Sequence, residues 1–278
     1  MTRHATEPSS QKLKEALSYV RQHIESFPSI AIVLGSGLGE FADRLPRRSI
    51  LPTAAIPHYP RLTVEGHKGR LVFGRIRNKT ILAFQGRIHF YESDDLPGIL
   101  FPIHLASKLG VRTLLVTNAA GGVNRQFRPG DLMLITDQIN LTFENPFLPT
   151  GSAALPSRTN HPPYDERIQQ TVLEVAAAQG ILLRRGVYCG VKGPSYETAS
   201  EIEMIRRIGG DAVGMSTVNE VSLAARLGMR VGGISCITNL ATGIGSAALS
   251  HSEVTQVAAR VKRKFTSLLR GVLERLPR

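Results

Sequence analysis

The chain alternates short apolar runs with longer stretches in which apolar residues recur every three or four positions. The apolar runs span residues 30–34, 71–75, 81–84, 113–116, 132–136, 186–190, 212–215 and 231–237. Runs of this length are typical of buried strands, and the stretches between several of them are typical of amphipathic helices. This alternation predicts an α/β fold with a twisted, mixed sheet flanked by helices.

Helices are predicted where the three- and four-residue spacing is clearest. The first runs from residue 9 to about residue 25 and ends before Pro28, others centre on residues 100–107, 202–208 and 218–225, and a long terminal helix starts near residue 254. With 278 residues the chain is long enough to bury a substantial core. We expect one domain over residues 1–278, with a flexible tail at 1–8 and a functional loop at 145–163, a Pro- and Ser-rich segment without any period.

Two segments repeat one pattern. SKLGVRTLLVTNAAGG at 107–122 and ARLGMRVGGISCITNLATG at 225–243 each run from a helix end through Leu-Gly and a strand to Thr-Asn. We expect a helix-to-strand unit that is used twice in the sheet. Each copy would place its Thr-Asn pair at the carboxyl end of a strand.

The formal net charge of +12 is spread along the chain, and its densest run is KRK at 262–264. No basic stripe alternates with aromatic residues, as a single-strand nucleic-acid binder requires, so an anionic small substrate is favoured over nucleic acid. Cys189 and Cys236 have no metal-ligand spacing and are expected to be buried, reduced packing residues. No apolar run has membrane-spanning length and no secretory signal is readable, which predicts a cytoplasmic protein without a membrane partner.

Polar side chains follow the apolar runs at several separate places. They are Ser36, Arg87, His89, Asn118, Glu197, Ser216 and Asn239. Ligands of open α/β sheets bind beyond the carboxyl ends of the strands. We therefore expect these residues to converge on one ligand site.

The glycine turn GSGLGE at 35–40 is a weak signal by itself, because it matches neither a dinucleotide fingerprint nor a P-loop. It is either a plain tight turn or a cradle in which backbone N–H groups and the Ser36 hydroxyl hold a free phosphate. Further along, Arg87, His89 and Tyr91 alternate, so an extended chain would project all three to one side. The fork of an arginine suits phosphate oxygens, and His67 and His89 would add donors, although a lone histidine is more often a structural residue.

Seven motifs together resemble the trimeric, low-molecular-mass purine nucleoside phosphorylases, and bacterial more than vertebrate members. They are GSGLGEFAD, EGHKGRLVFG, FQGRIHFYE, VTNAAGGVN, KGPSYETASEI, GDAVGMSTVNEV and CITNLATG, which occur in the family's order from about residue 30 to the terminal helix. The resemblance implies a single nucleoside phosphorylase domain with a partly barrel-like sheet. It also implies a homotrimer that uses orthophosphate as co-substrate and needs no cofactor or metal.

The resemblance implies a role for each matching residue. The phosphate site would comprise Ser36, His67, Arg87, His89, Ser216 and the backbone of Ala119; the ribose site Tyr91, Met215 and His251; and the base pocket Tyr196, Glu197, Val213 and Asn239. Asn239, Glu197 and His89 are the expected catalytic residues. The implied reaction is reversible phosphorolysis of 6-oxopurine (2′-deoxy)ribonucleosides, such as inosine and guanosine, to the free base and (deoxy)ribose 1-phosphate.

Glu197 is the most informative residue for the substrate class. An ionised carboxylate only accepts hydrogen bonds, and 6-oxopurines present N1–H whereas adenine presents a lone pair, a mismatch that costs about 1–3 kcal/mol. Glu197 is also placed to be a carboxylate at a helix N-terminus, with Thr198 or Ser195 as the cap. Both roles are compatible.

Two alternatives stay open on the sequence. A methylthioadenosine phosphorylase would be expected to carry Asp where Asn239 stands, and His251 favours a 5′-hydroxyl over a methylthio group. A basic α/β protein that binds nucleotides without turnover is the other. The sequence departs from many relatives at Tyr196, where they have Phe, and near Leu155, where they often present a Phe to the neighbouring subunit.

Overall fold

The computed structural model describes residues 10–46, 48–64, 66–144, 163–245 and 251–277, and side chains in the last helix from residue 256 onward. The predicted tail at 1–8, the loop residues 145–162 and the side chain of His251 lie outside the described part. Leu155 also lies outside it.

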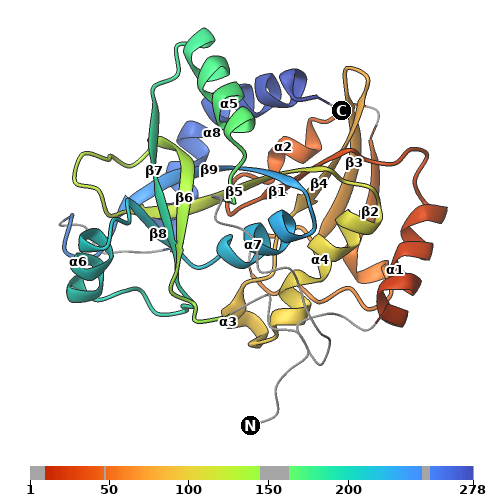
Figure 1. Cartoon of the computed structure of the whole chain (residues 1–278), viewed down its shortest axis with the longest axis horizontal. Coiled ribbons are helices and arrows are strands. Elements are labelled where there is room, and N and C mark those ends of the chain that lie inside the picture. The colour runs from red at the N-terminus through yellow and green to blue at the C-terminus, as the bar shows by residue number, and fades with distance from the viewer. Residues whose placement is uncertain (1–9, 47, 65, 145–162, 246–250, 278) are drawn as a thin grey trace.

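The described strands form one nine-stranded sheet in the order β2-β3-β4-β1-β5-β8-β7-β6-β9 (Figure 1). Their bounds are β1 Ile30–Leu34, β2 Ser49–Pro52, β3 Arg70–Ile76, β4 Lys79–Gln85, β5 Thr113–Gly122, β6 Leu132–Asn140, β7 Leu183–Gly190, β8 Ala212–Gly214 and β9 Arg230–Leu240. All eight predicted strands are present. The short β2 was not predicted, because its alternating exposed and buried residues do not form an apolar run.

Part of the sheet closes on itself. β5 pairs with β8 and also with β9, β9 pairs with β6, β6 with β7, and β7 with β8, so these five strands form a closed ring. β1 pairs with β5 on the outside of this ring, and β4, β3 and β2 continue from β1 as an open arm. The pairings are parallel and antiparallel, which confirms the predicted mixed and partly barrel-like sheet.

Helices cover both faces of the sheet (Figure 1). Along β1, Ile30, Ile32 and Leu34 pack in a cluster with α2, α5 and α8, while Ala31 and Val33 pack in a second cluster with α1, α4 and α7. Alternate side chains of a strand point to opposite faces, so a strand buried on both faces is apolar throughout. The helices are α1 Ser10–Gln22, α2 Glu40–Asp43, α3 Phe90–Ser93, α4 Leu96–Lys108, α5 Glu166–Ala178, α6 Ala199–Arg207, α7 Val218–Arg226 and α8 His251–Arg275.

The repeated helix-to-strand unit is confirmed. α4 leads into β5, α7 leads into β9, and β5 and β9 are parallel neighbours. The Thr-Asn pairs lie inside these strands and not beyond them, because β5 and β9 run on to Gly122 and Leu240 to close the ring. A bulge between Ala120 and Gly121 accommodates the closure.

The glycine turn after β1 depends on a close approach between two backbones. A Cβ on Gly35 would lie 2.8 Å from the Cα of Asn118 and 2.8 Å from the carbonyl oxygen of Thr117, both in β5. Backbone atoms cannot move aside as a flexible side chain can. By contrast, a Cβ on Gly39 in the same turn would meet nothing closer than the Gln85 side chain at 3.5 Å.

We therefore expect Gly35→Ala to destabilise the protein by about 1–3 kcal/mol, because the added methyl separates β1 from β5. Chemical denaturation measures this change. Gly39→Ala is the matched control and should unfold close to the wild type. Equal stability of the two variants would contradict the role given to Gly35.

Candidate functional site

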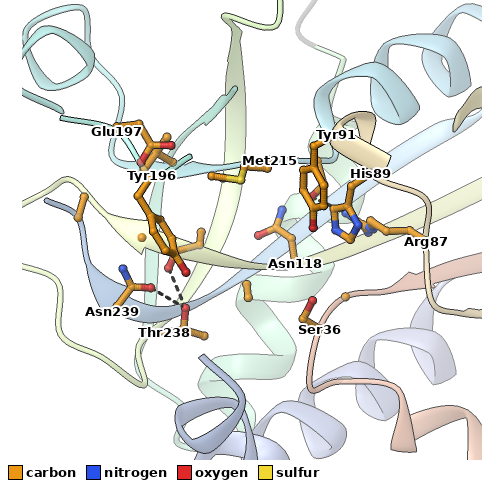
Figure 2. A pocket seen from close by; sticks show the side chains of 18 residues that line it. Ser36, Arg87, His89, Tyr91, Asn118, Tyr196, Glu197, Met215, Thr238 and Asn239 are labelled. Atoms are coloured by element: carbon orange, nitrogen blue, oxygen red, sulfur yellow. Dashed lines mark hydrogen bonds between the residues drawn. The ribbon is translucent and has the colours of Figure 1, made fainter. Parts of the chain in front are cut away.

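A pocket, drawn in Figure 2, lies just beyond the carboxyl end of β1 and beside residues 118–121 of β5. Its walls come from the turn after β1, the segment after β4, the strands β5, β8 and β9, and the loop before α6. The lining residues are Gly35, Ser36, Arg87, His89, Tyr91, Asn118, Ala119, Ala120, Gly121, Tyr196, Glu197, Val213, Gly214, Met215, Ser216, Thr238, Asn239 and Ala241.

The pocket brings together most of the residues singled out in the sequence. Of those whose side chains are described, His67 is not in its lining. His67 lies directly behind the wall, because its Nε2 is 3.4 Å from the Ser36 hydroxyl. The side chain of His251, at the start of α8, lies outside the described residues.

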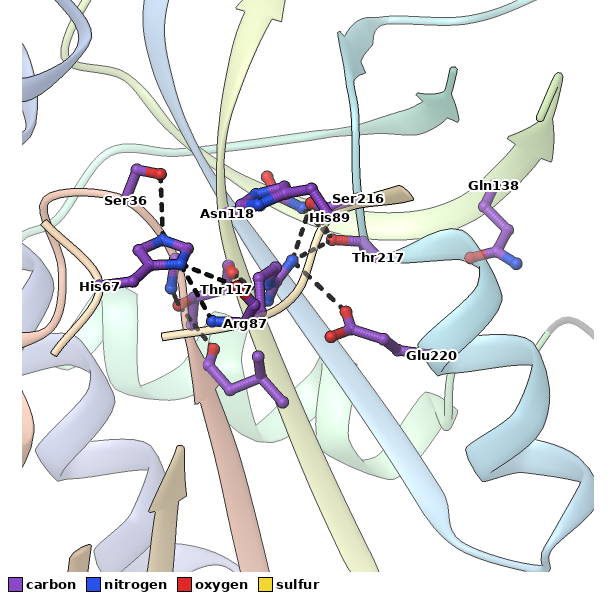
Figure 3. Close-up of polar contacts among 12 residues, drawn as sticks. Ser36, His67, Arg87, His89, Thr117, Asn118, Gln138, Ser216, Thr217 and Glu220 are labelled. Carbon is purple, nitrogen blue, oxygen red and sulfur yellow. Dashed lines mark hydrogen bonds and ion pairs between the residues drawn. The ribbon is translucent and has the colours of Figure 1, made fainter. Parts of the chain in front are cut away.

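One end of the pocket is organised around Arg87, whose side chain is only 2% exposed (Figure 3). Its Nη1 donates to Ser216 Oγ and to Thr217 Oγ1, each at 2.8 Å. Its Nη2 donates to the carbonyl of Thr117 at 2.7 Å. Glu220 Oε2 lies 3.4 Å from Nη1 and supplies a buried counter-charge from α7.

Arg87 retains donor capacity for a ligand. Its Nε is buried and has no hydrogen-bond partner among the described residues. A guanidinium has five N–H groups in a fixed fork, and an unused one in a buried site is costly. An oxyanion that reaches this nitrogen would satisfy it.

Three rings stack beside this end of the pocket. His67 stacks on His89 with centroids 5.2 Å apart, and His89 stacks on Tyr91 with centroids 5.0 Å apart. Tyr91 belongs to α3, so the extended chain predicted through this motif ends at His89. Ile88 and Phe90 still pack on the opposite side, because both are buried in the core.

The orientation of His89 is set by Glu92, which sequence reasoning missed. Glu92 Oε1 accepts from the backbone N–H of His89 at 2.6 Å and lies 3.0 Å from its Nδ1, while Oε2 accepts from the backbone and the hydroxyl of Thr63. Burial raises the pKa of the Glu92 carboxyl, but the hydrogen bonds from His89 and Thr63 outweigh it and lower that pKa to about 2. The ionised carboxylate only accepts, so Nδ1 carries a proton and Nε2 faces away from Glu92.

His67 is an uncharged ring at neutral pH. Burial of the ring is the main cause and the neighbouring His89 the second; together they lower the pKa of His67 to about 4. Its Nδ1 lies within hydrogen-bond distance of the backbone N–H and the carbonyl of Arg87, at 3.2 and 2.9 Å. The ring therefore ties the Ser36 turn to the Arg87 segment.

The other end of the pocket carries Tyr196 and Glu197, in the loop before α6. Thr198 caps α6 and forms a capping box with Glu201, which confirms Thr198 as the cap and places Glu197 one residue before it. The side chain of Glu197 therefore does not cap α6. Half-burial of its carboxyl raises the pKa of Glu197 above the ordinary value of 4.5.

Asn239, on β9, lies at the same end of the pocket as Tyr196 and Glu197 (Figure 2) and is 8% exposed. Its Oδ1 accepts from the hydroxyl of Thr238 at 3.0 Å, and its Nδ2 donates to the carbonyl of Leu240 at 3.2 Å. Nδ2 has two protons, so one remains for a ligand. The amide is therefore held with its donor side available.

Thr217 and Glu220 are further residues that the sequence did not single out. The acidic residue in the first turn of α7 looks like an ordinary partner of the helix dipole. Only the three-dimensional structure shows that Glu220 is 5% exposed and faces Arg87.

The arrangement suits a ligand with an anionic group at one end and a flat ring with N–H and acceptor groups at the other. Among the described residues, no cluster of three or more His, Cys, Asp or Glu side chains has the arrangement of a metal site. Within the same residues, every helix is too short or too polar to cross a membrane. Such a pocket defines the class of nucleotide- or nucleoside-binding α/β proteins.

Comparison with known proteins narrows this class. Residues 29–274 match the family model of the phosphorylase superfamily. Purine nucleoside phosphorylase 1 of Geobacillus stearothermophilus is 42% identical over 266 residues, which cover 95% of this chain and 97% of that protein. The Bos taurus purine nucleoside phosphorylase is 37% identical, over 92% of this chain and 93% of that protein. A Schistosoma purine nucleoside phosphorylase, solved with hypoxanthine, superposes with a TM-score of 0.90 at 30% identity, over 99% of this chain and 100% of that chain.

These matches show that the chain belongs to the phosphorylase superfamily and, within it, to the purine nucleoside phosphorylases. The family assigned from the seven motifs is confirmed, and so is its fold.

We expect Glu220→Ala to lower the free energy of unfolding by about 3–5 kcal/mol, because it leaves the buried charge of Arg87 without its partner. Denaturant unfolding measures the change. Glu203→Ala is the matched control, since Glu203 pairs with Arg206 on the exposed face of α6 and should matter little. A loss at Glu220 no larger than that at Glu203 would show that the buried pair does not stabilise the fold.

Proposed function

We propose that this chain cleaves 6-oxopurine ribo- and 2′-deoxyribonucleosides with orthophosphate, reversibly, and releases the free base and (deoxy)ribose 1-phosphate. The observation that carries the proposal is a single pocket with an anion cradle around Arg87 at one end and the pair Glu197 and Asn239 at the other. The membership of the purine nucleoside phosphorylases supports it.

The phosphate end would hold orthophosphate through Ser36, Arg87, His89, Ser216 and the backbone of Ala119, with His67 behind Ser36. The unpartnered Nε of Arg87 supports this assignment. His89 would donate from Nε2 when protonated, or accept from a P–OH group. Nothing in this chemistry calls for a metal or an organic cofactor, and orthophosphate would act as co-substrate.

The other groups of the site would hold the nucleoside. Met215 lines the pocket between its two ends and Tyr91 lines it beside His89 (Figure 2), and both would contact the ribose. His251 remains the proposed partner of the 5′-hydroxyl. Val213 and Tyr196 would enclose the base, whose N1–H would donate to Glu197.

In the proposed reaction a phosphate oxygen forms the new bond to C1′ while the C1′–N9 bond breaks. The bonding electron pair goes to the purine, which then takes up a proton. The remaining N–H of Asn239 would donate to the purine at N7 or O6 as negative charge accumulates there. Holding both reactants in one pocket supplies the rest of the rate enhancement.

We also propose a homotrimer that acts in the cytoplasm. Phe143 is 89% exposed, and Tyr196 and Met204 are 46% and 47% exposed, so apolar side chains are available on the surface for a neighbouring subunit, and Tyr196 also lines the pocket. Cys189 and Cys236 are free, buried thiols, which suits a reducing compartment. Light scattering of the purified protein measures the oligomeric state.

The function is tested by following release of free base from inosine, guanosine, adenosine and methylthioadenosine, each with and without orthophosphate. We expect phosphate-dependent release from inosine and guanosine. Turnover must be measured, because a Schistosoma mansoni relative has been solved in complex with adenosine and binding alone does not discriminate. Cleavage of inosine without phosphate would overturn the proposal, and a preference for methylthioadenosine would replace it with the rival activity.

Glu197→Gln should reduce kcat/KM for inosine about tenfold or more and reduce the preference over adenosine, since an amide can also donate to adenine N1. Glu201→Gln is the matched control, because Gln preserves the capping box at the same helix. An unchanged ratio of inosine to adenosine turnover in Glu197→Gln would show that this carboxylate does not select the base.

Orthophosphate should raise the pKa of His67 above its value of about 4 in the free protein. The sign follows because a bound anion stabilises the charged imidazolium, whereas burial favours the neutral ring. Titration of the histidine ring signals by NMR, at constant ionic strength with and without phosphate, measures the shift. The signals of His23, outside the pocket, should not respond to phosphate; an equally unresponsive His67 would remove it from the phosphate site.

A further inference from the structure

Thr217 has a backbone conformation that threonine rarely adopts. Its φ is 76° and its ψ is −55°, and the N–H of Val218 donates to the carbonyl of Ser216 at 2.8 Å. These values and this hydrogen bond define a γ-turn, which is strained for a residue with a branched Cβ. Such strain, of about 1–3 kcal/mol, persists only where surrounding interactions hold it.

The hydroxyl of Thr217 does not serve the helix that it precedes. Thr217 is the N-cap residue of α7, where a threonine side chain ordinarily accepts from a backbone N–H of the first turn, yet no such bond is present. Thr217 Oγ1 instead accepts from Arg87 Nη1 at 2.8 Å and from Asn118 Nδ2 at 2.9 Å. Figure 3 shows Ser216 and Thr217 next to each other on one side of the Arg87 guanidinium, with Glu220 on another side of it.

Counting protons sets the direction of the remaining hydrogen bonds. A hydroxyl has two lone pairs and one proton, and both lone pairs of Thr217 Oγ1 are taken by Arg87 and Asn118. Its proton is therefore left for Ser216 Oγ, which lies 3.0 Å away. Ser216 Oγ then accepts from Thr217 and from Arg87, at 2.8 Å, so its own proton has two places left to go: a ligand in the pocket and the neighbouring buried hydroxyl of Tyr188.

We propose that Thr217 is a positioning residue that makes the Ser216 hydroxyl a dedicated donor to bound phosphate. Thr217 is 2% exposed and is not in the lining of the pocket, so it acts through its three polar neighbours in that lining, Ser216, Arg87 and Asn118. If the Thr217 hydroxyl is removed, Ser216 is free to turn its own proton away from the pocket, and Arg87 Nη1 and Asn118 Nδ2 each lose an acceptor. The inference rests on the proposed phosphate site.

The test compares Thr217→Val, which removes the hydroxyl but retains the branched shape, with Thr217→Ser, which retains the hydroxyl. Thr113→Val is the matched control, because Thr113 is a buried threonine at the start of β5, whereas the pocket is lined by residues 118–121 of that strand. Initial rates of inosine cleavage give KM for phosphate and KM for inosine separately. Thermal unfolding of each variant shows that it is folded.

We expect Thr217→Val to raise KM for phosphate about tenfold or more, as for loss of a hydrogen bond to a charged group, and KM for inosine less than about threefold. Thr217→Ser and Thr113→Val should stay within about threefold of the wild type in both constants.

An unchanged KM for phosphate in folded Thr217→Val would overturn the proposal, and so would an equal rise in both constants or an equal defect in Thr217→Ser. If Thr217→Val does not fold, Thr217→Ala takes its place beside Thr217→Ser, at a temperature where both are folded. The same comparison of KM for phosphate with KM for inosine then decides. Absence of phosphate-dependent cleavage by the wild type would instead reject the proposed function itself.

Discussion

The pocket depends on the burial of one positive charge, the guanidinium of Arg87. A buried charge is tolerated only when it is paired and hydrogen-bonded, and the acceptors of Arg87 come from β5, from the residues before α7 and from α7 itself. These segments are far apart in the sequence, so satisfying Arg87 requires that the sheet and α7 be assembled. The same assembly leaves its Nε without a partner. The interaction that stabilises this end of the molecule thus also prepares it for an anion.

The closed ring of strands explains how the second end of the pocket is placed. β5 and β9 come from the two copies of one helix-to-strand unit and lie parallel. Asn118 and Asn239 are therefore on neighbouring strands but staggered, since Asn239 lies opposite Gly121. Ring closure through β8 then brings Val213 and Met215 next to them. An open sheet would bring the strand ends to one edge only, whereas the ring surrounds the base end on several sides. Geometry of this kind suits a flat, rigid ligand.

The sequence predicted the eight apolar strands, the helices α1, α4, α6, α7 and α8, and twelve residues that now line the pocket. The strands could be predicted because burial on both faces makes a strand apolar. Seven of the pocket residues could be predicted because polar residues near strand ends stand out, whereas Ala119, Tyr196, Val213 and Met215 were implied only by the family resemblance. The short strand β2, Thr217 and Glu220 were missed. The reason is physical: an acidic residue in a first helical turn satisfies the helix dipole in any fold, and only tertiary packing distinguishes a buried partner of Arg87 from a solvated one.

The carboxylate of Glu197 and the amide of Asn239 change in opposite directions during the proposed reaction: the hydrogen bond of one weakens while that of the other strengthens. A hydrogen bond from purine N1–H to Glu197 is strongest while the base is neutral, and it weakens as negative charge accumulates on the ring beside a carboxylate. The bond from Asn239 to N7 or O6 strengthens in the same step. Only interactions that are stronger in the transition state accelerate the reaction, so Asn239 would contribute to turnover and Glu197 chiefly to the choice of base. The raised pKa of Glu197 fits this division, because a half-buried carboxyl gains most from a substrate that brings its own donor.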